Sequence, residues 1–356
     1  MAPEKHRQSN RLSPIALPMM PRLDGRDAEA LTLHHFGISG SAIELGGERT
    51  QNFRIRTSGT TDFILKVSAP QEDIDVVMLE SAALLHIERT APAIVAPRVA
   101  TALNGQESIY LGPHDGRHLR LLSYVQGTPL SMVETPSAEL RRAIGRAVAD
   151  LDAALRSFDH PFSHQRDLIW DIKNIGRVKT FFELIDPERR PLVEIMMRRF
   201  ERLAAPHMTS LPAQTVHSDM NGQNILVAPG RNDRIVGFLD FGDLVHAPRL
   251  VDLAGVALLQ IGQTGDDLQA IVDVVHAYDG ATRLTPLEVR LLPELMIARC
   301  IINVAVTESL AACQPANRPY IMKNNPASWA RLDWLHTLPV DALPEAINLR
   351  SEDRAP

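Results

Sequence analysis

Two short polar segments in the second half of the chain have side chains suited to phosphate chemistry. The first, 217–224, places Asp219 and Asn224 five residues apart, and the second, 240–243, reads Asp-Phe-Gly-Asp. Strand-like residues flank both segments, which predicts a loop followed by a hairpin with an acid at a strand end. Phosphoryl transfer needs a carboxylate near the attacking hydroxyl, oxygen ligands for magnesium and a cation on the leaving phosphates. Asp219 fits the first role, and Asn224 and Asp240 fit the second, because magnesium prefers hard oxygen ligands.

The order of the two segments matters more than either segment alone. A His-x-Asp triplet occurs by chance in many chains, and Asp-Phe-Gly often marks only a turn. Together they match the protein-kinase pattern, in which Asp and Asn stand five residues apart and Asp-Phe-Gly follows. The combination therefore predicts a kinase-like phosphate site.

A lysine in the first part of the chain can supply the cation. Lys66 stands inside an apolar strand-like run, 62–67. One interpretation is an edge-strand lysine whose ammonium reaches water beyond an apolar stem. We favour phosphate contact, because a turn precedes this strand and a helix follows it, as in a nucleotide-binding lobe. Glu80 in that helix can pair with Lys66 or can simply be solvated. Three other acids compete for the pairing: Asp73, Asp75 and Glu88.

Residues 45–53 lie where a phosphate-covering turn belongs. Gly46 and Gly47 would let backbone N–H groups approach phosphate oxygens closely. Arg49 and Asn52 either touch phosphates or stabilise the turn. Since the segment does not fit G-x-G-x-x-G, this prediction depends on its position alone.

The composition limits the class of protein and its partners. The chain has 356 residues, 45% apolar and 22% charged, with a net charge of −6 and no basic stripe. This composition is globular and argues against a nucleic-acid partner. No window approaches eighteen uninterrupted apolar residues, which argues against a membrane partner. Two cysteines, Cys300 and Cys313, lack disulfide-framework or metal spacing, so we expect a soluble protein in the reducing cytoplasm.

Secondary-structure patterns divide the chain into two lobes. We expect an α+β, two-lobed, protein-kinase-like fold with an N-terminal β-sheet lobe that has one main helix, and a larger, mostly helical C-terminal lobe. The expected parts are a disordered tail (1–22), a nucleotide-binding lobe (23–127), a catalytic and substrate-binding lobe (128–345) and a second tail (346–356). A turn at 126–129 is the candidate hinge.

The elements expected in the two lobes follow from the same patterns. Strand candidates in the first lobe are 42–45, 52–57, 62–67, 98–102, 108–112 and 119–125, with helices at 27–36 and 74–90. Helix candidates in the second lobe are 137–158, 192–203, 250–260, 266–278 and 285–312, around a β-like island at 214–227 and 235–241. Residues 285–288 (Thr-Pro-Leu-Glu) predict a capping box with proline at the first helical position.

Three segments carry a family resemblance: 216–224, 240–243 and the Asp-Leu-Ala at 252–254. They resemble the signature of the aminoglycoside phosphotransferase-like kinases, a superfamily that includes choline, homoserine and hydroxylysine kinases. The resemblance covers residues from about 30 to 335. Further segments are similar to the hydroxylysine kinase branch: 48–53 (ERTQNF), 168–174 (LIWDIKN) and 284–299.

This resemblance implies roles for the polar residues. It implies Asp219 as catalytic base, Asn224 and Asp240 as Mg²⁺ ligands, and Lys66 on the α- and β-phosphates of ATP or GTP. The nucleobase would lie against the hinge, bonded to backbone groups of Ser123, Tyr124 and Val125.

Two other residues would be structural, and two positions depart from the family pattern. Asp252 would brace the catalytic loop, and His217 would pack and bond locally. Ser218 stands where the family usually has glycine, and we expect so small a residue to be tolerated. Glu80 stands where the hydroxylysine branch often has glutamine, which leaves the partner of Lys66 open.

A hydroxylated amino acid that accepts phosphate carries an ammonium and a carboxylate, so its site would need a residue of opposite charge for each. Asp243 can meet the ammonium, Arg299 can pair bidentately with the carboxylate, and Trp170 and Asp171 can line one wall. The alternatives are a salt bridge for Arg299 and a packing aromatic for Trp170.

We therefore expect a Mg²⁺-dependent phosphotransferase that moves the nucleotide γ-phosphate to a small hydroxylated amino acid or amino alcohol. Alternatives are a kinase for homoserine, choline, an aminoglycoside or a sugar, a non-catalytic nucleotide-binding scaffold, and a metal-dependent hydrolase using His217, Asp219 and Asp240.

Overall fold

The computed structural model describes residues 22–46, 50–70 and 72–352. The predictions for residues 1–21 of the N-terminal tail, for Gly47 and for Arg49 lie outside the described residues.

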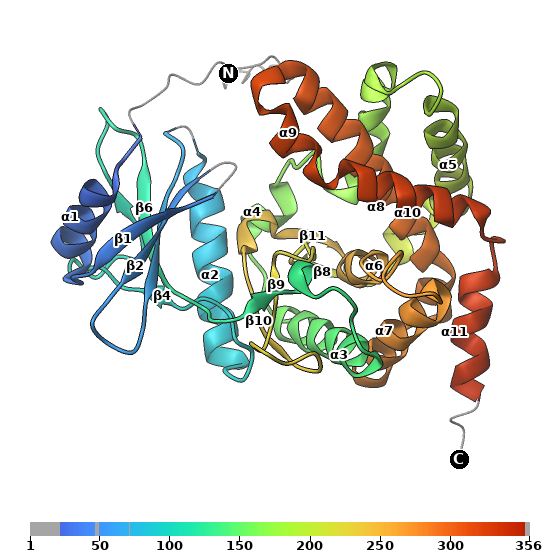
Figure 1. Ribbon diagram of the computed structural model, residues 1–356, viewed down its shortest axis with the longest axis horizontal. Helices are drawn as coiled ribbons and strands as arrows, with labels where there is room; N and C mark the ends of the chain where they lie inside the picture. Colours follow the sequence, from blue (N-terminus) through green and yellow to red (C-terminus); the bar gives the residue numbers. More distant parts are fainter. Residues whose placement is uncertain (1–21, 47–49, 71, 353–356) are drawn as a thin grey trace, which may run out of the picture.

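Antiparallel strands form the sheet of the N-terminal lobe, on the left in Figure 1. The strands are β1 (Ser41–Leu45), β2 (Gln51–Arg56), β3 (Phe63–Val67), β4 (Val99–Ala100), β5 (Ile109–Tyr110) and β6 (His118–Ser123). Their order across the sheet is β1-β2-β3-β6-β4, and β5 also pairs with β6. Each lies within or close to a predicted strand.

Side chains alternate between the two faces of this sheet, as the strand period of two requires. Leu65 and Val67 of β3 are buried in a small core that includes residues of α1 (Gly25–Phe36). Lys66 stands between them and meets α2 (Ile74–Thr90) instead. Arg120 of β6 pairs directly across from Lys66, so α2 receives two cations from one face of the sheet.

Helix α2 connects the two lobes. Leu79, Leu84 and Ile87 belong to the same buried core as the helices of the C-terminal lobe. The helix also packs against α3 (Ala138–Leu155) and against the turn 241–243. The position of α2 at the lobe boundary is therefore set by its packing against the larger lobe.

The C-terminal lobe is mostly helical (Figure 1). Its remaining helices are α4 (Pro161–Gln165), α5 (Arg190–Leu203), α6 (Leu250–Leu258), α7 (Asp267–Ala281), α8 (Pro286–Cys313), α9 (Arg318–Ile321), α10 (Asn325–Thr337) and α11 (Ala342–Glu352). Short 3₁₀ segments are η1 (Leu130–Met132), η2 (Ile172–Leu184), η3 (Ala205–Ser210), η4 (Phe241–Asp243), η5 (Pro315–Asn317) and η6 (Met322–Asn324). Of these, α4, the 3₁₀ segments and the helices after α8 had no helical counterpart in the sequence prediction.

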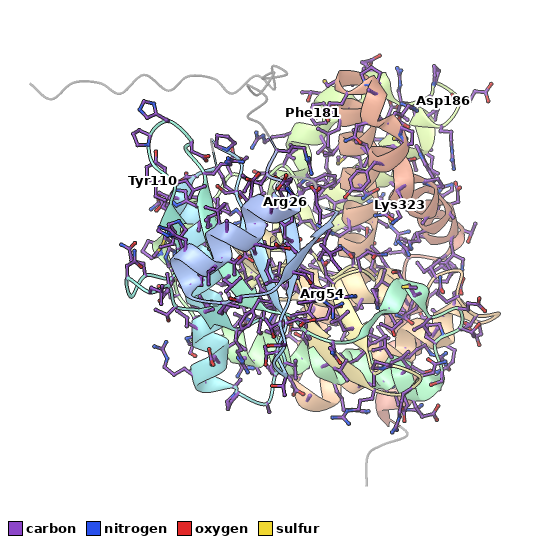
Figure 2. All side chains as sticks on the ribbon, turned by 60° about the vertical axis from the view of Figure 1, so that its left-hand side comes forward. Arg26, Arg54, Tyr110, Phe181, Asp186 and Lys323 are labelled. Carbon is purple, nitrogen blue, oxygen red and sulfur yellow. The ribbon has the colours of Figure 1, made fainter. Side chains whose placement is uncertain are left out.

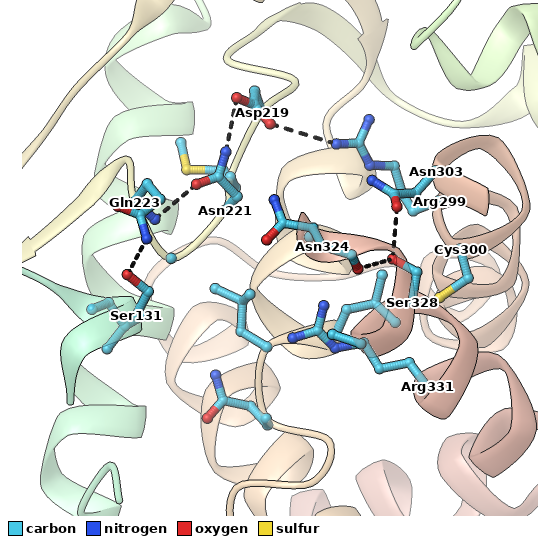
Figure 3. Close-up of a pocket in the computed structure, with 18 of the residues that line it drawn as sticks. Ser131, Asp219, Asn221, Gln223, Arg299, Cys300, Asn303, Asn324, Ser328 and Arg331 are labelled. Carbon is cyan, nitrogen blue, oxygen red and sulfur yellow. Dashed lines mark hydrogen bonds and ion pairs between the residues drawn. The ribbon is translucent and has the colours of Figure 1, made fainter. Parts of the chain in front are cut away.

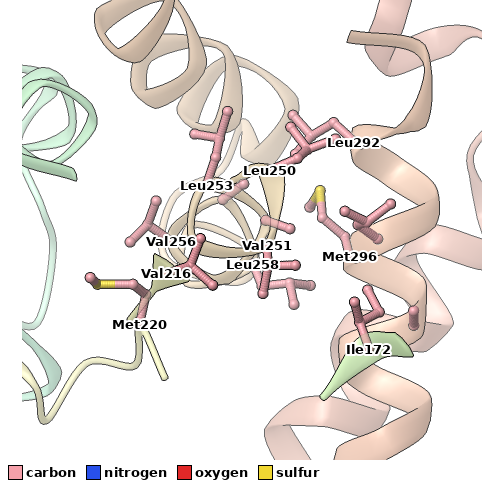
Figure 4. Packing of buried hydrophobic residues seen from close by; sticks show 14 of the residues in the cluster. Ile172, Val216, Met220, Leu250, Val251, Leu253, Val256, Leu258, Leu292 and Met296 are labelled. Carbon is pink, nitrogen blue, oxygen red and sulfur yellow. The ribbon is translucent and has the colours of Figure 1, made fainter. Parts of the chain in front are cut away.

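Helix α8 is the central helix of this lobe. It begins at the predicted capping box, in which Thr285 and Glu288 bond each other's backbone N–H groups. It is long and apolar enough to cross a membrane, but 67% of that stretch is buried inside the lobe. Its hydrophobicity is that of a helix surrounded by its own protein, and Figure 4 shows α8 residues Leu292 and Met296 beside the apolar face of α6.

Two small antiparallel sheets hold the polar segments. One is formed by β7 (Thr128–Pro129), β9 (Ile225–Val227) and β10 (Ile235–Phe238), and the other by β8 (Ala213–Val216) and β11 (Val245–Pro248). The polar loop 217–224 runs from β8 to β9, and the second segment follows β10. The two segments are therefore neighbours because both are anchored in the same pair of sheets.

The structure corrects the prediction of a C-terminal tail from residue 346. Residues 346–352 are helical as the second half of α11. Leu343 and Ile347 are buried, one helical turn apart, and the His276 ring on α7 donates to the Ile347 carbonyl at 2.8 Å. The two apolar residues pack this helix against α7. The sequence prediction missed the helix because most of the residues after Ile347 are polar.

A close helix crossing gives a stability prediction. A methyl group on Gly145 of α3 would stand 2.1 Å from the Val274 carbonyl oxygen on α7. We expect Gly145→Ala to lower the free energy of unfolding by about 3 kcal/mol, because the helices must separate. Gly280→Ala on α7 is the control, since its methyl group meets nothing within 4 Å. Urea unfolding that showed equal effects would contradict the close crossing.

Candidate active site

A buried carboxylate holds the loop between β8 and β9. Asp252, in the first turn of α6, is fully buried and accepts hydrogen bonds from the backbone N–H groups of His217 and Ser218, each at 2.8 Å. Ser218 has a φ of 68°, in the left-handed region that favours glycine. A serine costs about 1 kcal/mol there. The bonds to Asp252 offset this strain and explain how the loop accommodates Ser218.

His217 has no nitrogen left for chemistry. Its Nε2 lies 2.9 Å from the Leu239 carbonyl and donates to it, while Nδ1 accepts from the Asp219 N–H at 3.3 Å. The ring is fully buried and packs edge-on against Phe241. The local structural role implied by the family resemblance agrees with this geometry, and a hydrolase that used His217 as a base does not.

Asp219 is the acid of this loop that faces a pocket. Its Oδ2 accepts from Asn221 at 2.9 Å and from Asn224 at 2.8 Å, and its Oδ1 lies 3.9 Å from Arg299 Nη2. The side chain is 30% exposed and lines the pocket described below. Burial and the nearby Asp243 charge raise the pKa of Asp219. A raised pKa makes the carboxylate a better proton acceptor.

Asn224 and Asp240 fit a magnesium ion that arrives with a nucleotide. The Asn224 amide nitrogen donates to both the backbone and side-chain oxygens of Asp219, at 3.0 and 2.8 Å, which leaves its Oδ1 for a cation. Asp240 has a φ of 57° and a carboxylate that is 59% exposed. Among the described residues, no group of three or more His, Cys, Asp or Glu could hold a metal. Nucleotide-bound magnesium needs only one or two protein ligands beside the phosphates.

Lys66 belongs to a buried cluster of three charges. Its ammonium lies 2.8 Å from Glu80 Oε1, and Arg120 Nη2 lies 2.6 Å from Glu80 Oε2. Burial alone would raise the pKa of Glu80, but Arg120 and Lys66 outweigh it and lower the pKa to about 2. Burial alone would lower the pKa of Lys66, whereas Glu80 and Asp240 raise it. All three side chains are therefore charged at neutral pH.

The partner of Lys66 is thus Glu80 and not a competing acid. Asp73 caps α2 by accepting from the Asp75 N–H at 3.0 Å, and Glu88 lies 3.9 Å from Arg98. A carboxylate rather than an amide at position 80 suits this chain, because two cations converge on it. Sequence reasoning missed Arg120, although a lone arginine in an apolar strand was the available signal.

The cluster also reaches across the lobe boundary. Lys66 Nζ lies 3.5 Å from Asp240 Oδ1, in the second polar segment. The side chains drawn from the two lobes therefore converge, and the ammonium lies beside the carboxylate that we assign to the metal.

The phosphate-covering turn is described only in part. A methyl group added at Gly46 would meet nothing within 4 Å, so its backbone is open to a ligand. Asn52 pairs across from Lys66 and its Oδ1 accepts from the Thr50 hydroxyl at 3.1 Å. Asn52 therefore stands beside Lys66 in the sheet and also stabilises the turn.

The hinge leaves few backbone groups for a nucleobase. The N–H groups of Ser123 and Tyr124 donate to the carbonyls of Arg98 and Asp62, each at 2.8 Å. The Tyr124 ring is covered by the Arg54 guanidinium, 3.9 Å from its centroid. Figure 2 labels Arg54 on the N-terminal lobe. Of the three predicted hinge residues, Val125 is therefore the one whose N–H can serve a nucleobase.

A pocket of about 290 Å³ adjoins Asp219 on the side of α8 and α10 (Figure 3). Trp170 and Arg299 line it, and Arg299 Nη1 also donates to the Trp170 carbonyl at 3.2 Å. Asp171 does not line it; its buried carboxylate caps η2 by accepting from the Lys173 N–H at 2.9 Å. Asp243 is also outside the lining and lies 3.7 Å from Arg166.

A second buried acid stands behind Asp252. Asp152 Oδ2 accepts from the Tyr278 hydroxyl at 2.6 Å, while its Oδ1 is buried with no donor opposite it. Burial, followed by the charge of Asp252, raises the pKa of Asp152 well above its usual range. A proton on Asp152 can be donated to Asp252. Asp152 thereby supports the Asp252 carboxylate, which in turn holds the loop between β8 and β9.

The sheet lobe, the helical lobe and the arrangement of Lys66, Asp219 and Asp240 between them define a kinase-like phosphotransferase. The chain belongs to the phosphotransferase enzyme family (APH), whose profile matches residues 39–288. Its relatives include the hydroxylysine kinases of Mus musculus, 26% identical over 89% of this chain and 90% of the relative, and Xenopus laevis, 24% identical over 82% and 84%. The chain is accordingly a kinase that phosphorylates a hydroxyl group, and the resemblance found in the sequence is confirmed.

Solved structures confirm the predicted fold class. The structure of a microcompartment-associated aminopropanol kinase superposes with a TM-score of 0.69 at 17% identity, covering 91% of this chain and 99% of that one. An amicoumacin kinase in complex with AMP-PNP and Ca²⁺ gives a TM-score of 0.62 at 12% identity, covering 85% and 91%. At such identities the likeness concerns the fold alone.

The buried acid pair gives a pH prediction. The native state holds the Asp152 proton more tightly than the unfolded chain does, so this group's contribution to stability falls as pH rises from about 4 towards the raised native pKa. Asparagine stays neutral in both states. We expect the stability of Asp152→Asn relative to the wild type to increase by up to about 1.4 kcal/mol per pH unit in that window. Urea unfolding between pH 4 and 8 measures it.

The control is Asp150→Asn, which removes a charge from the same helix at an exposed position. Parallel stability curves for wild type and Asp152→Asn across the pH range would show that Asp152 is not held protonated.

Proposed function

We propose that this kinase transfers the γ-phosphate of ATP or GTP, with Mg²⁺, to the hydroxyl of a small hydroxylated amino acid or amino alcohol, as hydroxylysine kinases do. One observation carries the proposal. The Asp219 carboxylate forms part of the pocket wall. The Asn224 amide bonded to it belongs to a residue whose backbone carbonyl accepts from the N–H of Leu239, next to Asp240, and Asp240 in turn lies 3.5 Å from Lys66. An acceptor in the pocket and a nucleotide between the lobes would meet at Asp219.

Each of the site residues then has a distinct role. Asp219 orients the acceptor hydroxyl and accepts its proton. Lys66, held by Glu80, neutralises the phosphates that remain on the nucleotide. Asn224 and Asp240 would hold the Mg²⁺ ion, which would supply positive charge to the phosphate oxygens. The backbone of Gly46 and the side chain of Asn52 lie where they can contact phosphates, and Val125 faces the nucleobase.

The charged side chains near the pocket indicate which groups of the acceptor each residue would bind. Arg299 is positioned for an anionic group of the acceptor, or for the transferring phosphate, and Trp170 offers an apolar wall. Asp243 lies outside the pocket lining, but its charge acts on Asp219, and it is the acid that we assign to an ammonium. Homoserine, choline, aminoglycosides and sugars are the alternative acceptors, and the aminopropanol kinase likeness keeps amino alcohols in the same group.

We also propose that the protein works in the cytoplasm. Both cysteines are free thiols, and burial raises the pKa of Cys300 to about 12. A pair of unlinked cysteines in a chain of this size is typical of a reducing compartment.

A screen of acceptors and nucleotides tests the function directly. We expect the wild type to transfer phosphate from Mg-ATP or Mg-GTP to hydroxylysine or homoserine in a direct assay that also includes ethanolamine and kanamycin. Asp219→Asn should lower kcat by roughly 10²–10⁴-fold, the usual contribution of a general base, while nucleotide binding persists. Asp240→Ala should abolish the nucleotide-dependent shift in Tm. Turnover that survives Asp219→Asn would contradict the assignment.

The Glu80 cluster gives a second functional prediction. Glu80→Gln leaves the charges of Lys66 and Arg120 buried and facing each other, so Lys66 should move away from the phosphates. We expect kcat/KM for the nucleotide to fall at least about tenfold, a loss of about 1.4 kcal/mol of transition-state stabilisation. Glu88→Gln, at a half-exposed position on the same helix, is the control and should change kcat/KM less than about twofold. Equal effects of the two substitutions would disprove a role for the cluster.

A further inference from the structure

A second arginine lines the acceptor pocket and has no assigned role. Arg331 stands on α10 and shares the pocket with Asp219 and Arg299. Its Nε is buried without a hydrogen-bond partner, and no acid in the part of the chain that the structure describes forms an ion pair with it. The residue as a whole is partly buried, and a partly buried guanidinium without a counter-charge is costly to folding. Such a group is retained more readily where a ligand supplies its counter-charge.

The neighbours of Arg331 do not supply that charge. Cys300 lies close to it in the same pocket wall. Burial raises the pKa of the Cys300 thiol to about 12, so the thiol is neutral at physiological pH. Burial also lowers the pKa of Arg331.

The charge balance of the whole lining points the same way. Asp219 is the only acid among the residues that line the pocket, whereas both Arg299 and Arg331 are cations. Asp219 faces Arg299 at 3.9 Å, so the charge of Arg331 is left over. The other polar lining residues are neutral: Ser131, Asn221, Gln223, Gln260, Gln263, Asn303, Asn324 and Ser328.

The wall that carries Arg331 is braced. The Ser328 hydroxyl bonds Asn303 Oδ1 on α8 at 3.0 Å, and the Asn325 amide donates to Thr307 at 2.8 Å. These bonds fix α10 to α8, so the arginine stands on a rigid element rather than on a loop. Figure 3 shows Asp219 and Arg331 on opposite sides of the pocket.

We propose that Arg331 binds the carboxylate of the acceptor, at the end of the pocket remote from Asp219. This inference rests on the proposed function and narrows it: the substrate class is a hydroxylated carboxylic acid, such as a hydroxy amino acid, and not an amino alcohol or an aminoglycoside. Aminoglycosides carry several ammonium groups and no carboxylate, and they would place these cations in a lining with one acid and two arginines. A guanidinium suits a carboxylate because it can donate two parallel hydrogen bonds.

The test compares acceptors that differ only in the carboxylate. Suitable pairs are hydroxylysine with 1,5-diaminopentan-2-ol, and homoserine with 3-aminopropan-1-ol. We expect the wild type to prefer the acid of each pair. Arg331→Gln should raise the acceptor KM of the acid at least about tenfold, the value of a charge-assisted contact, with kcat and the nucleotide KM changed less than about twofold. It should leave the KM of the amino alcohol unchanged.

Two further variants separate binding from folding. Arg331→Lys keeps the charge and should recover part of the affinity for the acid. Arg318→Gln, at an exposed position on α9, should behave as the wild type. An equal rise in KM for both members of a pair, or a loss of kcat alone, would overturn the carboxylate subsite.

Failure of the proposed function would look different. A wild type that phosphorylates no acceptor of either kind would overturn the function, and calorimetry with hydroxylysine and homoserine would then decide the subsite. Binding of either acid that Arg331→Gln weakens supports it. Binding that Arg331→Gln leaves unchanged, or no binding of either acid to the wild type, overturns it.

Discussion

The position of one buried ammonium group determines how the two lobes meet. Lys66 comes from the small sheet, Glu80 from the helix whose apolar face is packed into the larger lobe, and Asp240 from that lobe itself. Removing the Glu80 carboxylate would leave two cations, Lys66 and Arg120, that water reaches poorly, which costs several kcal/mol. Mutual attraction therefore holds Lys66 at the boundary between the lobes, beside Asp240.

The catalytic loop is supported by the same kind of interaction. The Asp252 carboxylate accepts hydrogen bonds from two backbone N–H groups. These bonds hold Ser218 in a left-handed conformation and Asp219 at the pocket wall. Asp152 stands behind it as a second buried acid. A site built in this way has its groups oriented before substrate binds, so little reorganisation is needed during phosphate transfer.

The sequence predicted what depends on local pattern and missed what depends on packing. The Asp-to-Asn interval, the strand around Lys66 and the capping box at Thr285 are local, and each was found. Arg120 and Arg331 were missed because their roles come from a strand register and from a helix that crosses α8. Asp171 was placed in the pocket because it adjoins Trp170, yet an N-cap position turns its carboxylate back towards Lys173.

The central claim is that a triphosphate and its metal bind between Lys66, Asn224 and Asp240. The most direct measurement is a crystal structure with Mn²⁺ and a non-hydrolysable ATP analogue, with anomalous scattering to place the metal. We predict Mn²⁺ bound to oxygens of Asn224 and Asp240, with phosphate oxygens in contact with the Lys66 ammonium. A triphosphate bound elsewhere, with Lys66 still paired to Glu80 and touching no phosphate, would contradict it.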